Sequence, residues 1–90
     1  MKSLNTGLKT GQAVVASTAT LIAASRIGRD TVIIENHGTT NVFIGASDVT
    51  TSTGLLLPGV VGASVALETT SAIYGIVATG TQAVSYAENF

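Results

Sequence analysis

Short apolar runs recur along this chain at intervals of about ten residues, separated by Gly, Asn, Asp and Ser. β-Branched residues dominate the runs, and no segment keeps apolar residues at helical spacing beside charged ones for three turns. Runs of this kind, divided by turn-forming residues, are typical of β-sandwiches and barrels. We therefore predict an all-β fold with about seven or eight short strands, either a small antiparallel β-sandwich of jelly-roll type or a barrel.

The apolar runs also predict where each strand lies and which face it buries. Side chains alternate between the two faces of a strand, so we expect Val65 and Leu67, and likewise Val84 and Tyr86, to face the core. Residues 72–78 are apolar on both faces, which indicates a strand in the middle of its sheet or at a subunit contact. The strands are expected at 13–17, 20–25, 31–36, 41–45, 54–57, 63–69, 72–78 and 82–88.

The 90 residues are expected to form one domain preceded by an arm. Residues 1–11 hold little core-forming material, so we assign them to an N-terminal arm that orders on a partner, and residues 12–90 to a single β-domain. Residues 13–24 resemble the apolar centre of a secretory signal, but Ser and Thr interrupt them and the stretch is too short to span a bilayer. We interpret this segment as strands and expect no membrane partner.

Charged side chains are scarce, which bears on the partners of the chain. They make up 10% of the sequence against about 25% in ordinary domains, while mean hydropathy is +0.51. Such a surface does little to keep copies apart, so we expect other protein to cover much of it. The alternative is a monomer kept in solution by Thr, Ser and Gly.

The basic residues are too few to bind nucleic acid. Lys2, Lys9, Arg26 and Arg29 are the whole basic complement and cannot form a stripe along a phosphate backbone. The two arginines lie in a predicted turn, where we expect them to be solvated or paired with Asp30. No nucleic-acid partner is expected.

His37 is the sole histidine and the first candidate for acid–base or metal chemistry. It lies in the segment ENHGTTN, a predicted hairpin connection in which Asn36, Gly38 and Asn41 tolerate the positive φ of tight turns. A metal site needs three or four ligands, whereas this chain has no cysteine and only five scattered acids. We predict that His37 is an exposed or interfacial turn residue, and that the chain holds no metal or other cofactor.

Motifs for covalent catalysis are also missing. The segment GASVA around Ser64 lacks the second glycine of a nucleophile elbow, and GVVG at 59–62 lacks the lysine of a phosphate-binding loop. No local pattern pairs two carboxylates. We assign no catalytic residue and predict that the chain is not an enzyme. The alternative is a small hydrolase that uses His37, and its support would be a measurable activity that His37→Ala removes.

The longest polar stretch, residues 46–53, is predicted to be a projecting loop that carries Asp48. Its Thr-rich part could belong to a sugar-binding surface, although such sites normally use an aromatic platform and this sequence has no Trp. A solvated loop is the simpler interpretation.

Three phrases resemble a known class of proteins. They are VIIENHGTTNVFIG, then VTTSTGLLLPG, then LETTSAIYGIVATGTQAVSYAE. In this arrangement of strands and turns the chain, from residue 31 onward, resembles small all-β decoration (cement) proteins encoded among the structural genes of tailed bacteriophages. Residues 1–25 lie outside the resemblance.

The resemblance implies a virion protein that is made in the cytoplasm of the bacterial host. It would bind the major capsid protein on the capsid surface as a symmetric homo-oligomer, expected to be a trimer, and stabilise the head. The alternative is a host-glycan-binding module of a phage fibre or spike, which exposed aromatic residues near Tyr74 or Tyr86 would favour. The expected partner contacts come from the arm, the polar loop and two outer strand faces: Leu4, Leu8, Ile33, Asp48, Thr50, Thr51 and Ile73.

Overall fold

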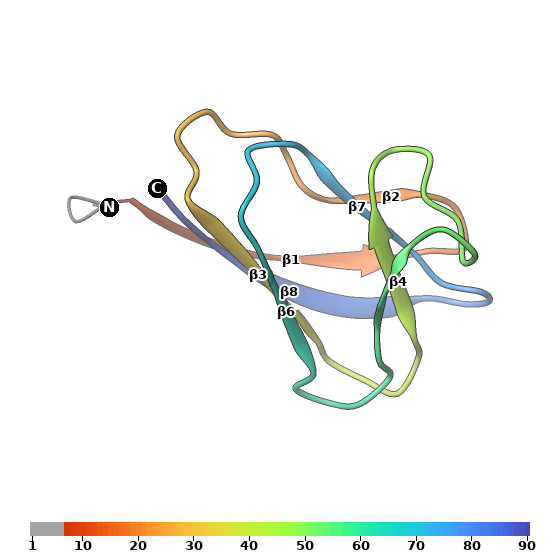
Figure 1. The fold of residues 1–90 in the computed structure, drawn as a ribbon. Coiled ribbons are helices and arrows are strands. Elements are labelled where there is room, and N and C mark those ends of the chain that lie inside the picture. The colour runs from red at the N-terminus through yellow and green to blue at the C-terminus, as the bar shows by residue number, and fades with distance from the viewer. Residues whose placement is uncertain (1–6) are drawn as a thin grey trace.

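The computed structural model describes residues 7–90, which form eight β-strands joined by turns (Figure 1). The fold is all-β, as the spacing of the apolar runs predicts. The strands are β1 (Leu8–Val15), β2 (Thr20–Ala23), β3 (Thr31–Asn36), β4 (Val42–Gly45), β5 (Leu55–Leu57), β6 (Ser64–Leu67), β7 (Ile73–Ile76) and β8 (Gln82–Asn89).

The strands form two four-stranded antiparallel sheets. Their orders are β1-β8-β3-β6 in the first sheet and β2-β7-β4-β5 in the second. The chain therefore changes sheet at every connection except the one from β4 to β5. This exchange of strands between two packed sheets is the jelly-roll topology, and it decides between the sandwich and the barrel that the sequence left open.

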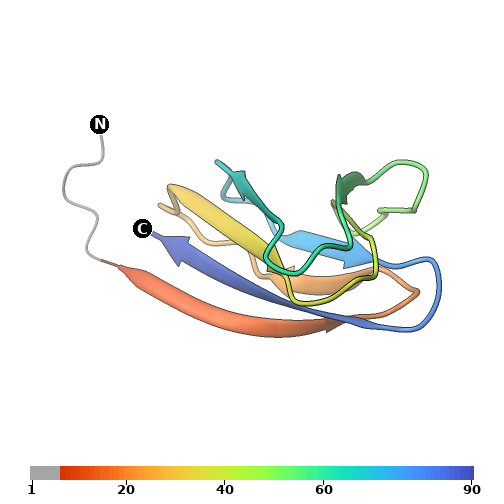
Figure 2. The ribbon, with the colours of Figure 1, turned by 90° about the horizontal axis from the view of Figure 1, so that it is seen from below.

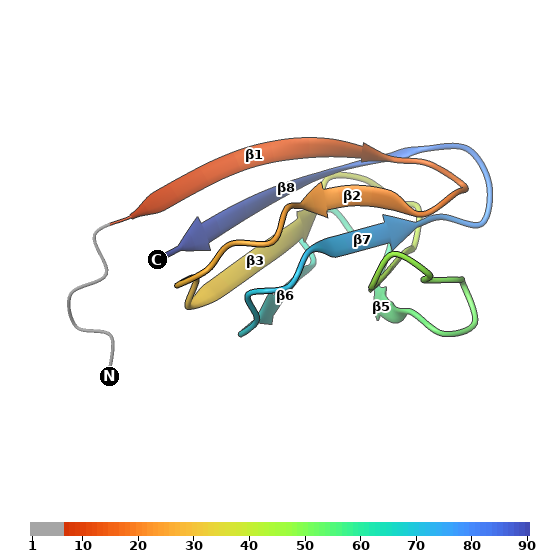
Figure 3. The same ribbon diagram turned by 90° about the horizontal axis from the view of Figure 1, so that it is seen from above.

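The first strand is longer than expected. β1 begins at Leu8 and pairs without interruption with β8 through Val15, so residues 8–11 are part of the sheet and not of an arm. Two glycines leave room for aromatic rings of the partner strand and its end. The Phe90 ring lies over Gly7. The Tyr86 ring lies over Gly11, where an added Cβ would come within 2.6 Å of that ring. Figures 2 and 3 show β1 and β8 running side by side along the molecule.

The core lies between the two sheets and follows the alternation predicted from the sequence. Val65, Leu67 and Tyr86 pack against it from the first sheet. The buried apolar side chains are Val15, Ile22, Ala23, Val32, Ile34, Val42, Ile44, Leu57, Ile73, Val77 and Val84.

β7 is a central strand, as its two apolar faces predicted, but Ile73 is not an outer contact. Its exposed fraction is 3%. The strand buries Ile73 and Gly75 and leaves the alternate residues half-buried, and the Ile22 side chain fills the space that Gly75 leaves. The expectation for Ile73 was wrong because a run that is apolar on both faces does not reveal which face meets the core.

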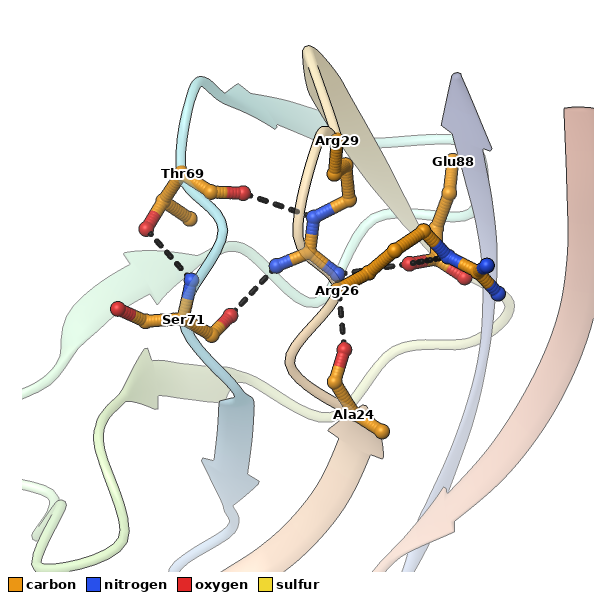
Figure 4. Close-up of polar contacts among 6 residues, drawn as sticks. All are labelled: Ala24, Arg26, Arg29, Thr69, Ser71 and Glu88. Atoms are coloured by element: carbon orange, nitrogen blue, oxygen red, sulfur yellow. Dashed lines mark hydrogen bonds and ion pairs between the residues drawn. The ribbon is translucent and has the colours of Figure 1, made fainter. Parts of the chain in front are cut away.

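Arg29 is a second correction, because its side chain is fully buried and not solvated. Its Nη1 donates to Glu88 Oε1 at 2.7 Å and to the Ala24 carbonyl at 3.0 Å, and its Nε donates to the Thr69 carbonyl at 2.7 Å. Nη2 donates to the Ser71 carbonyl. The guanidinium thus ties the β2–β3 and β6–β7 connections to β8 (Figure 4).

Arg26 lies on the same carboxylate but nearer the solvent. Its side chain is 32% exposed, its Nε lies 3.4 Å from Glu88 Oε1, and its guanidinium carbon stacks 4.0 Å from the centre of the Phe90 ring. Glu88 is buried between the two arginines, so its charge is paired and hydrogen-bonded, as charges inside proteins generally are.

Candidate interaction surface

The polar segment around His37 serves to hold two turns together. Asn36, at the end of β3, is fully buried; its Nδ2 donates to the carbonyls of Thr40 and Pro58, each at 2.9 Å. Its Oδ1 accepts a bond from the Gly38 N–H at 3.0 Å. The amide therefore fixes the β3–β4 turn and joins it to the β5–β6 turn.

The backbone of this turn differs from the prediction. Among residues 7–90, positive φ angles occur at Gly28, Gly62 and Gly80, and none at a residue other than glycine. The turn at 36–41 does not use the positive φ that its Asn and Gly residues suggested. The side-chain hydrogen bonds of Asn36 stabilise it instead.

His37 is exposed, as predicted for a turn residue. Its Nε2 hydrogen-bonds Ser85 Oγ on β8, and Glu35 lies beside Ser85 in the register of β3 with β8. A serine nucleophile also needs a group that orients the other ring nitrogen of the base and donors for an oxyanion. Within residues 7–90 the other ring nitrogen of His37 has no hydrogen-bond partner, and the pair lies on the outer face of the first sheet.

The described residues contain no group of three or more His, Cys, Asp or Glu side chains that could hold a metal ion. In the same part of the chain, no helix is long and apolar enough to cross a membrane.

Two of the predicted contact residues share the outer face of the first sheet. Leu8 opens β1 with an exposed fraction of 73%, and Ile33 projects from β3 with 45%. The register places Ile33 beside Ala87 of β8 and Ala66 of β6, whose short side chains leave it prominent. Leu4 lies outside the described residues.

Three other predicted contacts lie in the loop between β4 and β5. Asp48, Thr50 and Thr51 are exposed there, whereas Val49 is buried and contacts the chain where Gly45 and Gly54 have no side chain. The loop is therefore anchored to the second sheet and does not project freely.

The hydroxyl of Thr50 is used within this loop. Its Oγ1 accepts from the backbone N–H groups of Ser52 and Thr53, each at 3.2 Å, and lies 3.0 Å from Thr53 Oγ1. Thr50 thus shapes the loop, and the loop presents the side chains of Asp48 and Thr51 to the solvent.

The exposed apolar side chains extend well beyond the predicted contacts. They occur on three of the four edge strands, on β3 and in two loops, and Ile27, in the β2–β3 connection, is wholly exposed. The exposed loop residues Ile27, Val60 and Val61 are apolar residues next to glycines in turns, and this pattern in the sequence could have indicated their exposure. The large exposed apolar residues are Leu8, Val14, Leu21, Ile27, Ile33, Leu55, Leu56, Val60 and Val61.

An apolar cleft of about 260 Å³ opens beside the second sheet. Ile44, Leu55, Leu67 and Ile73 line it together with the connection at 69–72. Its size and lining suit one or two apolar side chains of another protein better than a polar ligand.

The four aromatic side chains are all at least partly buried. Tyr86 covers Gly11 and packs against the core, Phe90 stacks against Arg26, and both Tyr74 and Phe43 are half-buried. A sugar platform of exposed aromatic residues is therefore absent from residues 7–90.

Neither a family model nor a curated protein matches this sequence. The fold is similar to that of a chain from the Bacillus endospore appendages, a family of disulfide-linked pili, with a TM-score of 0.56 and 17% identity. The match covers 93% of this chain and 84% of that chain. At this identity the likeness shows a shared β-rich fold, and the present sequence contains no cysteine that could form a linking disulfide.

Proposed function

We propose that this chain is a capsid decoration protein, which binds the major capsid protein on the surface of a phage head and stabilises it. The observation that carries the proposal is the number of large apolar side chains left exposed on a jelly roll with few charges. Isolated exposed apolar residues are ordinary, but nine on so small a domain favour a surface that other protein covers. The resemblance of the sequence to decoration proteins supports the capsid surface as the place where this covering occurs.

The proposed mechanism is the addition of buried area across the junctions of the capsid. The predicted contacts whose side chains are exposed and available to meet the capsid are Leu8, Ile33, Asp48 and Thr51. Full burial of an Ile side chain contributes about 1.5–3 kcal/mol. With 45% of Ile33 still exposed, its contribution to each contact is about 1 kcal/mol, and many copies acting together make such contacts effective.

The direct test is binding to heads that lack the protein, measured by co-sedimentation. We expect saturable binding, a rise in the temperature at which the heads open, and about fivefold weaker binding of Ile33→Asp. Ser64→Asp is the matched control, because Ser64 is exposed on the same face of the same sheet and presents no large apolar surface. No binding by the wild-type protein, or equal weakening by both variants, would contradict the proposal.

A self-assembling appendage subunit is the second candidate, and the likeness of the fold to a pilus protein favours it. Electron microscopy of the purified protein distinguishes the two: filaments formed without any capsid support the appendage, and a small closed oligomer supports decoration. The glycan-binding alternative is less well supported, because the aromatic side chains within residues 7–90 are all at least partly buried.

A further inference from the structure

β1 is an edge strand with an unusually long free side. All eight of its residues pair with β8, and within residues 7–90 no strand lies along its other side (Figure 3). The other edge strands have three or four residues each, and the pairing of β2 with β7 is broken by a register shift between Leu21 and Ala23. β1 therefore offers the most extended backbone for pairing with another chain.

The register identifies the backbone groups that are free. Gly7 N donates to Phe90 O at 2.7 Å and Phe90 N donates to Gly7 O at 2.9 Å, so these two residues form a hydrogen-bonded pair. Such pairs alternate along an antiparallel ladder, which directs the odd-numbered residues of β1 toward β8. The N–H and C=O groups of four even-numbered residues consequently point to the open edge: Leu8, Thr10, Gln12 and Val14.

This edge lacks the devices that usually prevent pairing. β1 contains no proline, and its ladder with β8 has no bulge. Its single charged residue, Lys9, has its side chain on the face opposite to Leu8 and Val14. Those two residues are 73% and 62% exposed at the two ends of the strand, on the same outer face.

We propose that β1 pairs antiparallel with β1 of a second copy of this chain, with Gly11 on the two-fold axis. In this register Leu8 of each copy lies opposite Val14 of the other, and Thr10 lies opposite Gln12. About eight backbone hydrogen bonds form between the copies, because each of these four pairs uses the free groups identified above. The first sheets of the two copies become one continuous sheet.

The side chains distinguish this register from its neighbours. A shift that puts Thr10 opposite Thr10 leaves Val14 without a partner, and one that puts Gln12 opposite Gln12 does the same to Leu8. The proposed register covers both apolar side chains and places Lys9 opposite Ala13, so that no like charges face each other. A two-fold pairing of this kind is isologous and closes on itself.

The pairing goes beyond the proposed decoration function, since it requires a second copy and no capsid. It gives a dimer, whereas the sequence led us to expect a trimer. Light scattering separates the two, and a trimer whose β1 amides exchange freely would overturn the pairing. A dimer in solution would leave the test of capsid binding unchanged.

Cross-linking through single cysteines tests the register, because the chain has no cysteine of its own. Thr10→Cys mixed with Gln12→Cys should give a disulfide-linked heterodimer under mild oxidation, since paired residues lie within the Cα separation that a disulfide needs. Each variant alone should remain largely unlinked. Linking of Thr10→Cys to itself, or of Gln12→Cys to itself, would overturn the proposed register.

Hydrogen exchange tests the pairing without a cross-link. On dimer formation the amides of Leu8, Thr10, Gln12 and Val14 should become protected, while the odd-numbered amides of β1 are already protected by β8. Thr10→Lys/Gln12→Lys places like charges opposite each other and should weaken the dimer at least about tenfold. Ser64→Lys/Ala66→Lys, on the exposed face of the other edge strand of the same sheet, is the matched control; equal weakening by this control, or no change in the even-numbered amides, would overturn the pairing.

Discussion

Arg29 offers the sharpest test of how this fold is held together. Its buried guanidinium pairs with Glu88 and donates to three backbone carbonyls. Arg29→Met leaves Glu88 as a buried carboxylate, and loss of one member of a buried pair costs about 3–5 kcal/mol. A chain of 90 residues has a free energy of unfolding of about 5–13 kcal/mol, so this one change should remove a large part of it.

Urea unfolding followed by circular dichroism measures the effect. We expect a lower midpoint with an unchanged slope, together with a fall in the melting temperature of about 15–30 °C. Arg26→Met is the matched control; its side chain is partly exposed and lies farther from the same carboxylate, so we expect a loss of about 1 kcal/mol.

The double variant Arg29→Met/Glu88→Leu separates the charge from the packing. In Arg29→Met the buried carboxylate of Glu88 keeps only its longer contact with the part-exposed Arg26. If the cost of the substitution comes from that poorly paired charge, removal of Glu88 as well should restore much of the lost stability. Two results would refute the reasoning: a loss below about 1 kcal/mol for Arg29→Met, or a double variant no more stable than the single one.

Three further substitutions test the turns and the polar loop. Asn36→Ala removes the three hydrogen bonds of a buried amide, so the free energy of unfolding should fall by about 2–3 kcal/mol; a loss under about 1 kcal/mol in urea unfolding would contradict its role in joining the two turns. Val49→Ala should destabilise by about 1–2 kcal/mol and speed amide exchange of Gly54, and unchanged exchange there would show that Val49 does not anchor the loop. His37→Ala should change the free energy of unfolding by at most about 0.5 kcal/mol, because the side chain is exposed, and a larger loss would mean that its bond to Ser85 matters to the fold.

Within β3 and β8 the sequence allowed close predictions. β3 spans Thr31–Asn36, as predicted, and Val84 and Tyr86 of β8 face the core as their alternation indicated. These features depend on neighbouring residues, since the two-residue period of a strand and the chemistry of a turn are both local. The exposure of Ile33 on the outer face of β3 follows from the same alternation.

Other features depend on residues that are far apart in the chain. Arg29 and Glu88 are 59 residues apart in the chain, and nothing near either residue in the sequence reveals that they pair. The same holds for Ser85 beside His37, and for Gly7 and Gly11, which are covered by the rings of Phe90 and Tyr86.

The sequence by itself determined that the chain is an all-β domain, the approximate position of every strand after the first and most of the buried faces, because alternation and turn residues act over a few positions. Only the tertiary structure decided the jelly-roll order, the burial of Ile73 and Arg29, and the long open edge of β1. The physical reason is that strand order and burial depend on which distant segments come together, and the same local pattern is compatible with more than one such arrangement.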